Sequence, residues 1–314
     1  MSTSIDDATI AEVFAPFTFG DVFVGATQLN NPEDDHAGRG RILQYDSNLN
    51  LKGLLWVEGT THLVYGLNFA PGGVLWAHDP WAWVTLRVAP SGGQLPNRQF
   101  AQRGFSKTLF APDGTLWFTE SQRGDNQPEP LSTRLPPLPG ETTKIGDGGV
   151  YRFDVDGKEL EVCYPDIQGG ATGSFAVTHS FLTADGERLI YVSETGSRVM
   201  CYDLAHHRQL PDLRSHPGSF EHRFFDLAAM SGERVLASMG SRLELMTEAG
   251  EGLREYPLEG IGWSVLAPSP DEHFAYVGNW FSGQIVKLNL DSGELVTATD
   301  VAEKCMAGIA VYCL

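Results

Sequence analysis

The chain has few cysteines, few basic residues and no long apolar run. Its 314 residues include 4 cysteines, and 22 Lys and Arg stand against 40 Asp and Glu, which gives a net charge of −18. A surface of that sign repels nucleic-acid phosphates and anionic lipid headgroups. No apolar stretch approaches the roughly 18 residues of a membrane-spanning helix. We therefore expect neither a nucleic-acid partner nor association with a membrane.

The cysteines also lack the spacing of a metal or redox motif, because no Cys-x-x-Cys pair is present among Cys163, Cys201, Cys305 and Cys313. Sparse cysteines are typical of free thiols in a reducing compartment. A Cys305–Cys313 disulfide is the alternative. The N-terminal segment has two early acids and no basic region, unlike a secretory signal. These features predict a cytoplasmic protein.

Several motifs of common enzyme classes are missing as well. The sequence contains no G-x-S-x-G nucleophile elbow, no P-loop and no dinucleotide-binding fingerprint. Serine-hydrolase chemistry of that type, nucleotide hydrolysis and nicotinamide chemistry therefore have no support.

Glycine and proline are abundant, with 35 and 18 residues, and they punctuate an internal repeat. LNFAPGGVLWAHDP (67–80) and TLFAPDGTLWFTES (108–121) are plainly alike, and the same pattern recurs at 180–196, 226–240 and 264–279. Each is an apolar strand, a tight turn and a second strand, followed by another hairpin with alternating apolar residues. Four strands in about 40 residues are one blade of a propeller.

The two ends of the chain supply the missing parts of one blade. Five complete first hairpins and six second hairpins are visible, while GDVFVGA (20–26) resembles a second strand alone and CMAGIAVYCL (305–314) a first strand alone. Pairing between them would leave no exposed sheet edge. The sequence thus predicts an all-β fold: a six-bladed β-propeller over 1–314, closed by pairing of 306–313 with 21–26.

Three segments depart from the repeat. Residues 1–16 are expected to form a helical extension, because Ser4 can cap a helix with acids in its first turn. Two insertions, 27–40 and 121–148, both fall between the second and third strands of a blade. We predict that both cover one mouth of the central channel. Variable surface loops are the alternative.

ADGERLIYVSETGSRVMCYDL (184–204) and APSPDEHFAYVGNWFSGQIVKLNLDSGEL (267–295) resemble blades of the SMP-30/gluconolactonase, strictosidine-synthase-like and NHL propellers. The resemblance implies a ligand site in the channel. That superfamily includes metal-dependent lactonases, lyases, condensing enzymes and binding proteins. The lactonases of this superfamily hold their metal with an Asn on an innermost strand. None of the corresponding positions here is Asn, Asp or Glu; they are Tyr65, Ser106, Thr178, Phe224, Ser264 and Ala307. The metal ligands are therefore unknown, and a divalent ion remains an option.

Alternation along the innermost strands predicts which side chains face the channel. Small polar residues such as Ser106 share the expected inward register with Asp226, whereas Lys107 and His179 fall in the apolar register. His179 is therefore expected to be a hydrogen-bonded core histidine, although a local bulge would turn it inward.

Histidine is the natural residue for acid–base work and for metals. Our candidate acid–base residue or metal ligand is His222, with Tyr65 as its partner and His62 and His179 as further candidates. Asp226 is the candidate carboxylate base. One metal shared by His62, His179 and His222 is a further hypothesis. We expect four histidines in hairpins or a linker to be solvated: His206, His207, His216 and His273.

Aromatic residues are expected to form an apolar wall at the mouth, with polar groups beside them. The candidate substrate-binding residues are Trp81, Trp83, Arg103, Glu120, Arg123, Trp263, Asn279 and Trp280. Tryptophans packed between blades are the alternative.

These observations favour a small-molecule enzyme, a lactonase-like hydrolase or a lyase, that acts on an organic substrate in the channel mouth. A non-catalytic ligand-binding or scaffold propeller is the alternative. A condensing or cyclising enzyme of specialised metabolism is a third hypothesis.

Overall fold

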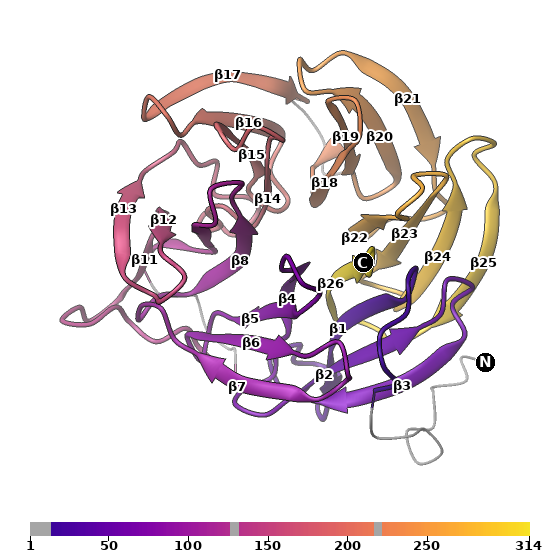
Figure 1. Ribbon diagram of the computed structural model, residues 1–314, viewed down its shortest axis with the longest axis horizontal. Helices are drawn as coiled ribbons and strands as arrows, with labels where there is room; N and C mark the ends of the chain where they lie inside the picture. Colours follow the sequence, from indigo (N-terminus) through magenta and orange to yellow (C-terminus); the bar gives the residue numbers. More distant parts are fainter. Residues whose placement is uncertain (1–13, 126–131, 217–221) are drawn as a thin grey trace. The chain divides into compact units, whose positions relative to one another are not determined.

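The computed structural model describes residues 14–125, 132–216 and 222–314, and these residues form an all-β structure (Figure 1). Their strands make six four-stranded antiparallel sheets and one two-stranded ribbon. The predicted six-bladed propeller is confirmed. The predicted helical extension lies almost wholly outside the described residues. Within the described part of the chain, no helix is long and apolar enough to cross a membrane.

The chain divides into two compact units. Unit 1 contains residues 1–98, 130–133 and 262–314. Its first sheet has the order β26 (Met306–Val311), β1 (Val22–Leu29), β2 (Gly38–Tyr45) and β3 (Leu51–Trp56). Its second is β4 (Tyr65–Phe69), β5 (Leu75–Asp79), β6 (Val84–Val88) and β7 (Gln94–Arg98). Its third is β22 (Trp263–Pro268), β23 (Phe274–Asn279), β24 (Gln284–Asn289) and β25 (Leu295–Asp300).

Unit 2 contains residues 99–129 and 134–261. Its first sheet is β8 (Phe105–Phe110), β9 (Leu116–Glu120), β12 (Val150–Phe153) and β13 (Glu159–Cys163). Its second is β14 (His179–Leu182), β15 (Arg188–Val192), β16 (Arg198–Asp203) and β17 (Arg208–Ser215). Its third is β18 (Asp226–Met230), β19 (Arg234–Ser238), β20 (Arg242–Thr247) and β21 (Gly252–Pro257). The ribbon pairs β10 (Arg123–Asp125) with β11 (Lys144–Asp147).

The two ends of the chain meet in the first sheet of unit 1, as the repeat count predicts. β26 pairs antiparallel with β1, from Val22 opposite Val311 to Ala26 opposite Met306. β26 also contacts β4 and β22, the first strands of the other two sheets of the unit. The C-terminal strand therefore joins the sheets of unit 1 to one another.

Apolar side chains at alternate strand positions form the core of each unit. In unit 1, Val24, Leu43 and Leu54 come from successive strands of one sheet, and all three are fully buried. In unit 2, Ile190 and Val235 belong to a buried cluster between the second and third sheets. This packing follows from the half-buried strand pattern, in which every second side chain faces the core.

A bulge breaks the simple alternation at the start of β8. Phe105 lies opposite Glu120, but Lys107 lies opposite Thr119, so Ser106 is the additional residue. The Ser106 hydroxyl donates to the Val177 carbonyl at 2.6 Å and is fully buried. The bulge shifts the register of the residues beside it, so simple alternation does not hold at the start of β8, and the channel-facing position of Ser106 remains a prediction.

The two insertions differ from their predicted extents and touch one another within unit 1. Strands β1 and β2 continue to Leu29 and Gly38, so the first insertion is a loop over 30–37 rather than 27–40. Ser132, in the second insertion, donates its backbone N–H to the Asp34 carboxylate at 3.0 Å and its hydroxyl to the His36 carbonyl at 3.0 Å. That the insertions cover a channel mouth remains a prediction.

The four cysteines are all free, which confirms the prediction of unpaired thiols. Cys163, Cys201 and Cys305 are buried and Cys313 is exposed. The alternative Cys305–Cys313 disulfide does not form.

Candidate ligand pocket and buried ionisable cluster

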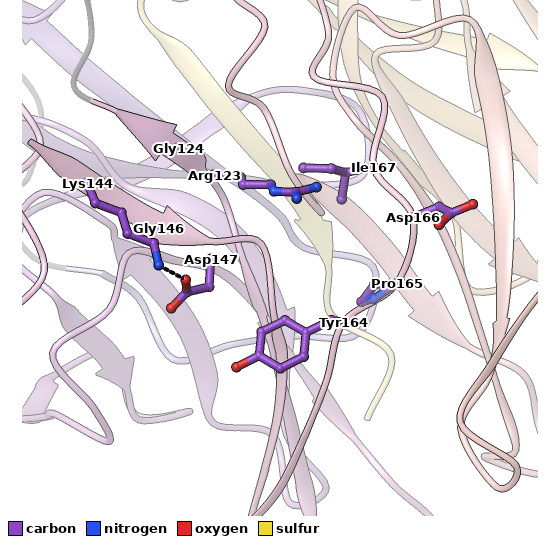
Figure 2. Close-up of a pocket in the computed structure, with 9 residues that line it drawn as sticks. All are labelled: Arg123, Gly124, Lys144, Gly146, Asp147, Tyr164, Pro165, Asp166 and Ile167. Atoms are coloured by element: carbon purple, nitrogen blue, oxygen red, sulfur yellow. Dashed lines mark ion pairs between the residues drawn. The ribbon is translucent and has the colours of Figure 1, made fainter.

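An open pocket of about 600 Å³ lies beside the β10–β11 ribbon in unit 2 (Figure 2). The ribbon supplies one side of it, and the segment that follows β13 supplies the other. The lining residues are Arg123, Gly124, Lys144, Gly146, Asp147, Tyr164, Pro165, Asp166 and Ile167. Its volume lies within the usual range for small-molecule sites, about 300–1,000 Å³.

Asp147 neutralises two of the basic groups around this pocket. Its carboxylate forms ion pairs with Lys144, drawn as a dashed line in Figure 2, and with Arg103 at 2.5 Å. Arg103 also lies 3.5 Å from a carboxylate oxygen of Glu120. The ion pairs depress the pKa of Asp147 against the raising effect of its partial burial. These charges are thus committed to one another.

Arg123 differs from these neighbours. Among the described residues, no acidic group lies within ion-pair distance of its guanidinium, although its backbone N–H donates to the Ser174 carbonyl at 2.8 Å. The Arg123 side chain is exposed at the pocket. It can therefore offer a planar, forked set of donors to an anion.

Glu120 anchors the buried end of this charge network. Its Oε2 accepts the backbone N–H groups of Asp147 and Gly149, both at 3.0 Å. Burial raises the pKa of Glu120 to about 7, although those bonds and Arg103 act in the opposite direction. Sequence reasoning selected Arg103, Glu120 and Arg123, and the structure brings all three to this region.

A second group, which we call the inner-strand cluster, comprises Lys107, His179, Glu194 and Asp226. Lys107, His179 and Asp226 lie on β8, β14 and β18, the first strands of the three sheets of unit 2, and β14 contacts both other strands. His179 Nδ1 lies 2.9 Å from Asp226 Oδ1, and both side chains are buried. Strict alternation along the strands did not predict that these side chains lie together, because the bulge at Ser106 shifts the register of β8 and β14 begins only at His179.

Burial shifts the pKa values of two members of the inner-strand cluster, Lys107 and Glu194. It lowers the pKa of Lys107, while the Asp226 charge acts in the opposite direction. It raises the pKa of Glu194, with His179 lowering that pKa and Asp226 raising it further. A carboxylate beside an imidazole is the arrangement that orients general bases.

His222 lies outside this cluster. It is exposed, its Nδ1 is 3.1 Å from Arg242 Nη1, and its ring is 6.3 Å from that of His216. Since its interactions within the described residues are with Arg242 and His216, the structure does not bring it to Asp226. Its predicted acid–base role remains a prediction.

His62 belongs to an aromatic group in unit 1. Its ring centroid lies 5.0 Å from that of His36 and 5.1 Å from that of Trp81. Burial, followed by the charge of His36, lowers the pKa of His62 to about 4. His62 is therefore a neutral ring at neutral pH and a weak base, so it is suited to bind a metal rather than to accept or donate a proton.

The other sequence-based candidates also lie in unit 1. Tyr65 begins β4 opposite His78 and is half-buried. Trp263 is buried and lies opposite Asn279, whose side-chain oxygen accepts the N–H groups of Phe281 and Ser282. Asn279 therefore shapes a turn. The remaining three are partly buried: Trp81, Trp83 and Trp280.

Sequence reasoning missed most of the pocket. Lys144 and Asp147 lie at the end of the long insertion, where a short β-ribbon had no signal. Tyr164 and Ile167 follow the outer strand β13, outside every segment that the sequence analysis selected. A Tyr-Pro-Asp-Ile segment directly after a strand was the available signal, because it combines an aromatic residue, a turn residue and an acid.

No protein-family model matches the chain, and no curated protein matches it in sequence. The resemblance to the SMP-30 group is therefore not confirmed. Among solved structures, a nidogen–laminin complex contains a similar chain, with a TM-score of 0.62 and 12% identity. The match covers 93% of this chain and 98% of the other. At that identity the likeness shows the propeller fold alone.

Proposed function

We propose that this chain is a ligand-binding propeller whose pocket beside the β10–β11 ribbon holds a small organic anion with an apolar portion. The observation that carries the proposal is the guanidinium of Arg123, which has no acidic partner in the described part of the chain and lies in a pocket whose other basic groups are paired. An anion that binds there replaces water around Arg123 without breaking an ion pair of the protein.

The rest of the lining fits the second half of such a ligand. Tyr164 and Ile167 supply an aromatic and an aliphatic surface, and Tyr164 is 59% exposed at the site. Ligand sites commonly combine apolar walls with a few fixed polar groups. The similar solved structure is a protein complex, which favours a binding role over catalysis as well.

The test compares benzoate with benzamide, its uncharged counterpart. Binding of each compound to the full chain is measured by ligand-observed NMR. We expect benzoate to bind more tightly than benzamide. Arg123→Ala should weaken benzoate binding at least about tenfold, since hydrogen bonds to charged groups contribute roughly 1.5–3 kcal/mol. Arg123→Lys should retain part of it.

Arg234→Ala is the matched control, because this arginine of the same unit hydrogen-bonds to Ser231 and lies outside the pocket lining. It should bind benzoate like the wild type. Equal binding of benzoate and benzamide, or unchanged binding in Arg123→Ala, would exclude an anion site.

The inner-strand cluster favours a second candidate, the hydrolase or lyase of the sequence analysis. His179 and Asp226 would form the acid–base pair, with Glu194 beside them. The test is turnover of a panel of lactones and aryl esters by the wild type and by His179→Asn. A general acid–base group contributes about 10²–10⁴-fold in rate, so a loss on that scale supports catalysis. Turnover within about threefold of wild type would exclude His179 from it.

A further inference from the structure

Three metal-ligating side chains meet on the outer side of unit 2. Glu161 and Cys163 are two residues apart on β13, so their side chains share one face of the strand. His207 belongs to the turn between β16 and β17 of the next sheet. One donor atom from each of these three side chains lies within 4.8 Å of the others.

The distances match those within a tetrahedral site. Cys163 Sγ is 3.6 Å from His207 Nδ1. In tetrahedral zinc sites the Zn–S and Zn–N bonds of about 2.3 and 2.0–2.1 Å place the two ligand atoms about 3.6 Å apart. The sulfur and nitrogen are thus spaced to bind one ion between them.

The other side of the imidazole is held by an acid. His207 Nε2 is 3.2 Å from Glu161 Oε2, and the other oxygen, Glu161 Oε1, accepts Arg152 Nη1 at 2.7 Å. Metal-binding histidines usually donate their second N–H to a carboxylate, which fixes the ring and strengthens it as a ligand. Glu161 therefore orients the ring that Cys163 faces.

The backbone of His207 also differs from that of most outer hairpins. The outer hairpin of each of the six sheets joins the third strand to the fourth. One residue near the end of each of these turns has a positive φ, and in four of the six it is glycine: Gly92, Gly157, Gly250 and Gly293. The two exceptions are Leu49 and His207, with φ of 63° and 51°. A left-handed non-glycine residue is strained. Leu49 is buried in the core, whereas His207 is exposed.

We propose that Cys163 and His207 bind a borderline transition-metal ion such as Zn²⁺, with Glu161 positioning the imidazole and the remaining coordination positions open to water or an external ligand. Sulfur with imidazole nitrogen is a donor set that zinc favours.

The experiment uses the full chain, stripped with a chelator and titrated with Co²⁺ and then Zn²⁺. We expect one Co²⁺ per chain with a thiolate-to-cobalt charge-transfer band, and loss of that band when Zn²⁺ is added. Cys163→Ser should abolish the band. Glu161→Gln should weaken Zn²⁺ binding by about 10–100-fold while leaving the band in place at saturating Co²⁺.

His207→Gly is the decisive variant, because glycine relieves the backbone strain while it removes the imidazole. Its unfolding midpoint without metal should be no lower than that of the wild type, yet its Zn²⁺ affinity should fall at least about tenfold. Cys313→Ser and His206→Ala are matched controls that keep the site. An unchanged cobalt spectrum in His207→Gly, or a wild-type spectrum without the thiolate band, would overturn the proposal.

Discussion

His78 in unit 1 and His179 in unit 2 are both buried, at 1% and 5% exposure, yet they have different neighbours. Burial alone lowers the pKa of His78 to about 3, and its Nδ1 has Thr85 Oγ1 at 3.4 Å. The Nδ1 of His179 faces the Asp226 carboxylate at 2.9 Å. The comparison shows that two histidines of similar burial differ through their neighbours, a hydroxyl beside His78 and a carboxylate beside His179.

The units also differ in connectivity. The first sheet of unit 1 combines strands from both ends of the chain, whereas each four-stranded sheet of unit 2 comes from one continuous segment. Unit 1 therefore depends on pairing between distant residues. Unit 2 carries most of the long insertion, the pocket beside the β10–β11 ribbon and the inner-strand cluster.

The largest effect should come from breaking the terminal pairing of unit 1. A chain that ends at Lys304 lacks β26, and with it the partner of β1 and the contacts to β4 and β22. We expect loss of cooperative unfolding, because exposed strand edges and an open core remain. Circular dichroism during urea denaturation would test this. A two-state transition with the native midpoint would contradict it.

A smaller effect should separate the two histidines. Asp226→Ala leaves the Lys107 charge without the acid that offsets its burial, and removing one partner of a buried pair costs about 3–5 kcal/mol. Thr85→Val, which removes the hydroxyl beside His78, should cost about 1 kcal/mol. Urea denaturation of both variants gives the comparison. Equal losses would mean that His179 is also an ordinary core histidine.

Glu120 should make stability depend on pH. Its pKa is raised by burial from 4.5 to about 7 in the fold, so the native state holds its proton more tightly than the unfolded chain. The stabilisation is full below about pH 4.5 and is lost as pH rises through about 7, with a total of up to about 3 kcal/mol. Glu120→Gln should flatten this part of the stability–pH curve. A curve unchanged by the substitution would place the effect elsewhere.

Removing the ribbon tests whether the insertion builds the benzoate site. Arg123 lies opposite Asp147, so a Gly-Gly linker can replace residues 124–146. The free energy of unfolding should fall by at least about 2 kcal/mol, because Leu135, Leu138 and Ile145 of the insertion are buried and their deletion removes core packing. Benzoate binding should be lost. NMR with the same probe would check it, and retained binding would show that the insertion does not build the site.

The repeat could be predicted from sequence because it depends on local patterns. Turn residues such as Gly73 and Gly114 recur between apolar strands, and the two incomplete strands at the chain ends require each other. The candidate site was predicted only in part. One blade repeat contains or adjoins Arg103, Glu120 and Arg123, so their shared location could be inferred. The position of Lys107 could not be inferred, because it depends on the bulge at Ser106.

The sequence by itself determined the blades, because alternation and turn chemistry act over a few residues and repeat along the chain. The tertiary structure decided which charged groups meet. The extra residue at Ser106 changes the side on which Lys107 falls, and β13 and the β16–β17 turn bring Cys163 to His207 although 43 residues lie between them. Such meetings depend on the packing of neighbouring sheets, since side chains distant in sequence become neighbours only when the strands that carry them are placed together.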